Sequence, residues 1–130
     1  MNYEIKNLSL RDVDAFQDFY YSYLEINPSL SPPFITITMI NYGSYIFMAR
    51  NTACKHSEIN CWELFQSKIK KTRKNMNIYI TEVRCRLING KFEYSMSQPC
   101  IHCTKKFKHF AKYYISQSNT TIYFRWSINS

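Results

Sequence analysis

Hydrophobic positions recur along this chain at two spacings, one typical of helices and the other typical of strands. Between residues 10 and 26 the apolar side chains lie three or four positions apart, which predicts an amphipathic helix. Ser9 precedes this helix and Asp12 follows three positions later, a pattern close to a capping box. The segment "NPSLSPP" ends it, because proline and the residue before it disfavour helix. Residues 1–33 are therefore predicted to form a helix and a linker.

Runs of β-branched and alternating residues predict the strands. "FITITMI" (34–40) and "YIFMAR" (45–50) are expected to form an antiparallel pair around the turn "NYGS". The second half of "NIYITEVRCRL" (77–87) alternates apolar residues with arginine, which gives one buried and one charged face. Asn89-Gly90 is the preferred pair for a two-residue hairpin turn, so 91–96 is predicted to be the return strand.

Two further helices and a final strand pair complete the pattern. The second helix is predicted over about 54–72, and the third begins at Pro99, which suits a first helical position. The apolar stripe of the second helix is Ile59, Trp62, Phe65 and Ile69. The last strands, 112–116 and 121–126, are joined only by "QSNT", and so short a connection predicts an antiparallel pair.

These elements predict one α/β domain over 1–130, with a mixed sheet of about five strands and helices on both faces. The chain is long enough to bury a core, and its hydrophobic content of 45% excludes disorder. The N-terminus lacks the apolar segment of a signal peptide, and no apolar run is long enough to cross a bilayer. We therefore expect a cytoplasmic protein with no membrane partner and with its five cysteines reduced.

The net charge of +8 has two interpretations. It favours an anionic partner such as phosphate or nucleic acid, but a basic, solvated surface would also explain it. Charge alone does not separate the two.

Two short motifs carry the candidate chemistry. His56-Ser57-Glu58 is weak by itself, since about 0.2 chance occurrences of His-x-Glu are expected in this composition. "PCIHC" (99–103) is far more specific, with about 0.006 expected occurrences of its Pro-Cys-x-x-Cys pattern. Its two thiols lie one turn apart at a helix N-terminus, where the helix dipole lowers thiol pKa values. One imidazole and two thiolates would leave the fourth position of a tetrahedral zinc open, which is typical of a catalytic site.

Together these motifs resemble the H-x-E…P-C-x-x-C signature of the zinc-dependent cytidine/deoxycytidylate deaminase superfamily. The resemblance covers roughly residues 34–126 and implies a three-layer cytidine-deaminase-like fold. The hairpin before "PCIHC" also resembles deaminase-like proteins of large DNA viruses, which would place the protein in a host cytoplasm. Two features depart from the family pattern. The gap between Glu58 and Pro99 is 40 residues, longer than in most members, and Ser57 and Gln98 replace commoner residues.

The resemblance implies a hydrolytic deaminase whose zinc is held by His56, Cys100 and Cys103. A zinc-bound hydroxide would attack the ring carbon that carries the exocyclic amine, with Glu58 shuttling the protons.

Substrate contacts are implied in the same way. The Ser57 backbone N–H and the Gln98 carbonyl would hold the ring edge, and Asn51 would contact the sugar. Independently of the resemblance, hairpins near a site often carry specificity, so Arg84, Arg86 and Lys91 on the predicted hairpin are candidates for contact with a substrate phosphate.

The other cysteines and histidines have simpler interpretations. Cys85 is expected to be a core thiol, and Cys54 and Cys61 are not expected to be ligands. His102 and His109 are expected to be exposed on the third helix.

Three functions follow as alternatives. The first is deamination of a free nucleoside or nucleotide, which antiparallel final strands would favour because they resemble the free-nucleoside branch of the superfamily. The second is a nucleic-acid editing deaminase, favoured by the charge and the aromatic content of 17%. The third is a non-catalytic interaction protein stabilised by zinc. Members of the superfamily are usually oligomers, so a homo-oligomer is possible.

Overall fold

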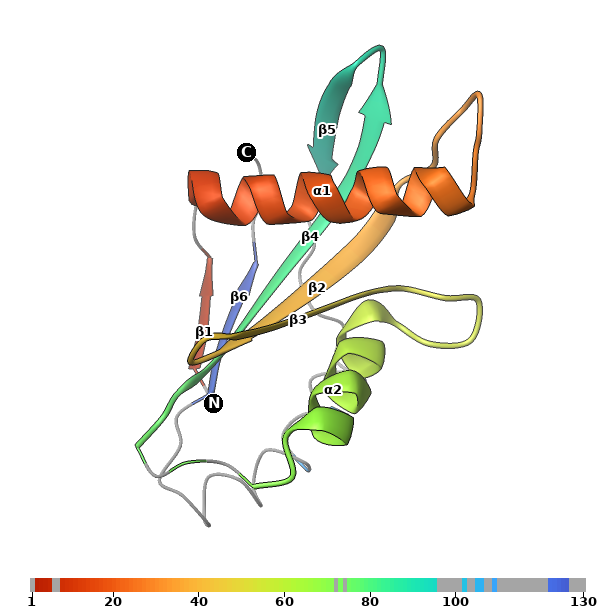
Figure 1. Cartoon of the computed structure of the whole chain (residues 1–130). Helices are drawn as coiled ribbons and strands as arrows, with labels where there is room; N and C mark the ends of the chain where they lie inside the picture. The colour runs from red at the N-terminus through yellow and green to blue at the C-terminus, as the bar shows by residue number, and fades with distance from the viewer. Residues whose placement is uncertain are drawn as a thin grey trace.

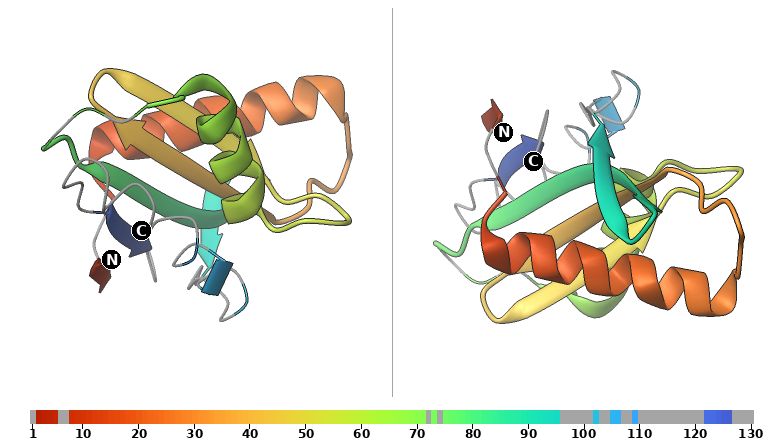
Figure 2. Two further views of the ribbon diagram at one scale, coloured as in Figure 1. Left: turned by 90° about the horizontal axis from the view of Figure 1, so that it is seen from below. Right: turned by 90° about the horizontal axis from the view of Figure 1, so that it is seen from above.

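The computed structural model describes residues 2–5, 8–71, 73, 75–95, 102, 105, 106, 109 and 122–126. Within these residues the chain forms a six-stranded sheet with one helix on each face (Figures 1 and 2). The elements are β1 (Asn2–Ile5), α1 (Leu10–Ile26), β2 (Ile35–Tyr42), β3 (Tyr45–Arg50), α2 (Ser57–Lys68), β4 (Ile78–Ile88), β5 (Lys91–Ser95) and β6 (Ile122–Trp126). This is the α/β class that the sequence predicts.

Strand β4 is the centre of the sheet. On one edge it pairs with β2, antiparallel, and β3 continues the sheet beyond β2. On the other edge β6 runs parallel to the first half of β4, and β5 runs antiparallel to the second half. Beyond β6 lies β1, which is also parallel. The sheet is therefore mixed, as predicted, and α1 and the short β1 belong to the same layered unit as the strands.

Helix α1 has the boundaries that the sequence predicts. Its N-cap is Ser9, whose hydroxyl accepts a hydrogen bond from the Asp12 amide at 3.1 Å. Phe16 and Tyr20 are fully buried and pack on one face of the sheet. The other members of this core are Ile35, Ile37, Met39, Val83 and Cys85. Cys85 is thus a core thiol, as predicted.

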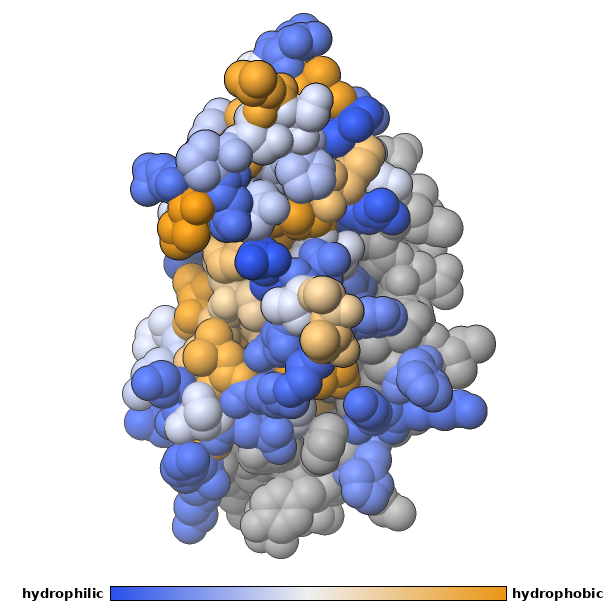
Figure 3. Space-filling view, turned by 90° about the vertical axis from the view of Figure 1, so that its right-hand side faces the viewer, coloured by the Kyte–Doolittle hydropathy of each residue, from blue (hydrophilic) through white to orange (hydrophobic). Residues whose placement is uncertain are grey.

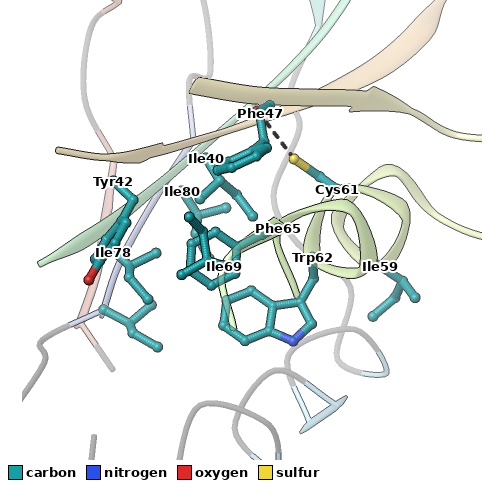
Figure 4. Packing of buried hydrophobic residues seen from close by; sticks show 11 residues of the cluster. Ile40, Tyr42, Phe47, Ile59, Cys61, Trp62, Phe65, Ile69, Ile78 and Ile80 are labelled. Atoms are coloured by element: carbon teal, nitrogen blue, oxygen red, sulfur yellow. Dashed lines mark hydrogen bonds between the residues drawn. The ribbon is translucent and has the colours of Figure 1, made fainter. Parts of the chain in front are cut away.

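Helix α2 covers the opposite face of the sheet. It is shorter than the predicted 54–72: hydrogen bonds between Thr52 and Lys55 hold the preceding residues in a loop, and Ile69 has extended dihedrals. Its predicted apolar stripe is buried and packs among isoleucines and aromatic rings from the strands (Figure 4). Cys61 lies on the same side and donates its thiol to the Phe47 carbonyl at 3.3 Å.

The hairpin between β4 and β5 is confirmed. Asn89 and Gly90 both have positive φ, 51° and 75°, as a type I′ turn requires. Phe92 and Tyr94 pack against the α1 core.

The prediction for the final strands is wrong in its pairing. β6 is a strand as expected, but both of its edges are occupied by parallel partners, β4 and β1. No antiparallel partner can therefore join it. The proposed partner, 112–116, lies outside the described residues. Strand β1 was not predicted from the sequence.

Hydrophilic residues cover most of the described surface on the side seen in Figure 3, and hydrophobic ones form small separate groups. No helix in the described part of the chain is long and apolar enough to span a membrane.

The three described cysteines are expected to differ sharply in reactivity. Burial raises the pKa of Cys61 and of Cys85 to about 12, whereas Cys54 is exposed. Since the thiolate is the reactive form, iodoacetamide at about pH 8 should modify Cys54 first and leave the two core thiols unmodified until the protein unfolds. Peptide mass spectrometry with and without denaturant measures this. Equal labelling of Cys61 and Cys54 in the native protein would contradict the packing of α2.

Candidate functional site

The first motif lies at the N-terminus of α2. His56 is the N-cap residue, and its carbonyl accepts the first helical hydrogen bond, from Asn60 N at 3.2 Å. Its side chain is exposed and forms no capping bond. Lys55, the residue before His56, forms an ion pair with Glu63, 2.9 Å from Nζ to Oε1. The prediction that His56 and Glu58 lie at the start of a helix is confirmed.

Glu58 is buried, although it lies in the first turn of the helix. Only 3% of the residue is exposed, and its Oε2 atom has no hydrogen-bond partner among the described residues. A carboxylate oxygen in this condition costs free energy, because burial removes its water without replacing it. Unsatisfied buried groups of this kind call for an explanation, and a catalytic role is one of the common ones.

A cavity of about 160 Å³ adjoins His56. Its lining residues are Cys54, Lys55, His56, Ile59, His102 and Lys106. His102 is the histidine of "PCIHC", and it is exposed, as predicted. The structure therefore brings a described residue of the second motif to the cavity beside the first. Cys100, Cys103 and Gln98, the other residues assigned to this motif, lie outside the described residues.

The fit of zinc to this site depends on the donors at hand. Among the described residues no group of three His, Cys, Asp or Glu side chains is close enough to hold a metal ion. His56 supplies one imidazole beside the cavity, and Glu58 supplies a buried carboxylate oxygen without a hydrogen bond. Imidazole and thiolate are the ligands that zinc prefers, so this donor set fits the ion when the two cysteines of "PCIHC" are counted.

The structure limits which atoms of Asn51 and Ser57 could contact a substrate, because several of them already form hydrogen bonds within the protein. The Asn51 side-chain oxygen accepts the Thr36 amide at 3.1 Å, and its backbone N–H donates to the Thr36 carbonyl at 3.0 Å. Its side-chain amide nitrogen can still donate to a sugar hydroxyl. Ser57 is fully buried with its hydroxyl toward the sheet. Its backbone N–H lies in the first turn, where it has no acceptor within the helix.

The hairpin arginines are engaged with protein groups. The guanidinium carbons of Arg84 and Arg86 lie 5.2 and 4.5 Å from the centre of the Phe34 ring. Arg86 also pairs with Glu93 at 3.4 Å. These contacts hold both side chains on Phe34.

Sequence reasoning missed a buried polar cluster beneath the first turn of α2, formed by Thr38, Ser57 and Glu82. None of the three is more than 2% exposed. The Ser57 hydroxyl lies 2.8 Å from that of Thr38 and 3.5 Å from Glu82 Oε1. The available signal was an acidic residue within "YITEV", on the strand side occupied by Ile78 and Ile80.

Comparisons of this chain with protein-family models, with curated proteins and with solved structures find no match.

Proposed function

We propose that this protein is a zinc-dependent hydrolytic deaminase that acts on the base of a free nucleoside or nucleotide. The observation that carries the proposal is the buried Glu58 carboxylate two residues after His56, and His56 itself lines a cavity together with His102 of the cysteine motif. A site that only stabilised the fold would need the ligands and would have no use for that carboxylate.

His56, Cys100 and Cys103 are the residues that would hold the metal. Zinc so bound supplies a water molecule with a pKa of about 7, and hence a nucleophile at neutral pH. His56 is suited to this role because the helix end keeps its side chain at the surface, facing the cavity.

Glu58 is the group that would move protons. The reaction replaces a ring C–NH₂ by C=O and releases ammonia, so protons from water must reach the ring nitrogen and the departing amine. A carboxylate oxygen with no competing hydrogen bond among the described residues can accept a proton and pass it on. Burial of Glu58 keeps bulk water away from this transfer.

The lining of the cavity bears on the substrate. About 160 Å³ is a small volume that suits a single base, and the positive charge of Lys106 at its edge favours a substrate that carries phosphate. A nucleotide satisfies both. The same lysine supports the second candidate, an editing deaminase acting on single-stranded DNA or RNA. The antiparallel strand pair, which would have favoured a free nucleoside, is no longer available as an argument.

The test is ammonia release over a panel of nucleosides, nucleotides and short oligonucleotides, with zinc content measured on the same sample. We expect about one zinc per chain and turnover of at least one nucleotide. Turnover of oligonucleotides alone would select the editing function. Zinc without any turnover would leave the non-catalytic interaction protein, and protein without zinc would refute the proposal.

A further inference from the structure

Glu82 occupies an unusual place for a carboxylate. It lies in the middle of the sheet on β4, directly opposite Thr38 of β2, and only 2% of it is exposed. Both residues lie on the sheet face that α2 covers. Glu82 is two positions after Ile80 on β4, Thr38 is two positions before Ile40 on β2, and both isoleucines belong to the α2 core. Nothing in strand formation requires an acid here, and burying one is costly.

The group above Glu82 is the N-terminus of α2. Ser57, the first helical residue, extends its hydroxyl between the two strands and meets Thr38 and Glu82. An ionised carboxylate only accepts hydrogen bonds, so the proton of Ser57 is directed to Glu82 and that of Thr38 to Ser57. The 3.5 Å separation is long for a hydroxyl–carboxylate bond, so the hydrogen bond between Ser57 and Glu82 is weak.

The charge of Glu82 is suited to this helix end. A helix N-terminus carries partial positive charge and several N–H groups without helical acceptors. Most helices satisfy one of them with a Ser, Thr, Asp or Asn cap, but the side chain of His56 makes no capping bond. A carboxylate below the first turn compensates for the missing cap and leaves the N-cap position to a histidine.

We infer that Glu82 is a positioning residue that, through Ser57, holds the first turn of α2 on the sheet and so fixes His56 and Glu58. The inference rests on the proposed function for its effect on catalysis, but its effect on the helix is independent of zinc. Misplacement of reacting groups by a fraction of a turn is costly for catalysis.

The test compares Glu82→Gln with Glu93→Gln, a matched change at an exposed glutamate of the hairpin. In the metal-free protein, backbone amide exchange of residues 57–60 should become about tenfold faster in Glu82→Gln, while the second half of α2 is unaffected. With metal bound, kcat should fall about tenfold with little change in KM, and the visible spectrum of the cobalt-substituted protein should shift. Glu93→Gln should change none of these.

Unchanged exchange of the first turn in Glu82→Gln would overturn the inference, even if activity fell. If Glu82→Gln fails to fold, Thr38→Val is the alternative variant. It removes the Thr38 hydroxyl from the hydrogen-bonded cluster of Thr38, Ser57 and Glu82 with little change in side-chain size. The same increase in amide exchange of residues 57–60 is expected. Unchanged exchange in that variant would overturn the inference as well. A parent protein that neither binds zinc nor releases ammonia would refute the proposed function, and the exchange data would still decide the role of Glu82 in the helix.

Discussion

Replacing Glu58 with alanine is expected to lower the rate of ammonia release by a factor of about 10²–10⁴ while zinc stays bound. The rate falls because the group that passes protons to the ring nitrogen and the amine is lost. Zinc remains because Glu58 is not among its proposed ligands. Steady-state kinetics with the best nucleotide from the panel, together with metal analysis of the same sample, measure both effects.

Glu63→Ala is the matched control, because Glu63 lies on the same helix but is exposed and paired with Lys55. Its activity should remain close to that of the parent. Stability gives a second readout. Because Glu58 Oε2 is buried and accepts no hydrogen bond from the described residues, its removal should spare a desolvation cost of about 1–3 kcal/mol and should not lower the melting temperature. A Glu58→Ala protein with full turnover would rule out the mechanism.

Replacing Phe65 with alanine is expected to cost about 3–5 kcal/mol of unfolding free energy. Phe65 is fully buried, and its ring centre lies 5.1 Å from that of Trp62 and 5.7 Å from those of Tyr42 and Phe47. The lost ring would leave a cavity where α2 meets β2 and β3. Against a typical total stability of about 5–15 kcal/mol, this is a large fraction. Urea denaturation followed by circular dichroism measures it.

Leu64→Ala is the control for this experiment, because Leu64 precedes Phe65 on the same helix and is 36% exposed. It should cost less than about 1 kcal/mol. A similar loss in both variants would mean that α2 does not present Phe65 to the sheet. Because the proposed catalytic and metal-binding residues of α2, Glu58 and His56, lie at its other end, Phe65→Ala should keep any deaminase activity of the parent under conditions where it remains folded.

The sequence predicted those parts of the fold that are determined locally. Ser9 and the prolines after Asn27 set the ends of α1, and Asn89-Gly90 set the hairpin, because each acts through its own backbone. The start of α2 was predicted too early because the spacing of apolar residues carries no information on the hydrogen bond between Thr52 and Lys55 that holds the preceding residues in a loop. β1 was missed for a related reason: four residues carry little pattern, and only pairing with β6 makes them a strand.

The candidate site was predictable to a similar extent. The spacing of His56 and Glu58 and their place at a helix start follow from motif and periodicity, and both are seen in the structure. Glu82 was not predictable, because a central strand is buried on both faces and alternation then no longer distinguishes inside from outside. Its role depends on which helix end comes to rest above it, and that is a property of the assembled sheet.

The parallel pairing of β1 with β6 affects how the protein is made. Asn2 pairs with Tyr123, 121 positions later, so the outer part of the sheet can close only when the late residues have left the ribosome. Until then the first half of β4 has an unpaired edge of backbone amides and carbonyls. Nascent chains are therefore expected to be vulnerable to intermolecular strand addition at this edge until β6 has been synthesised, and to depend on chaperones during that interval.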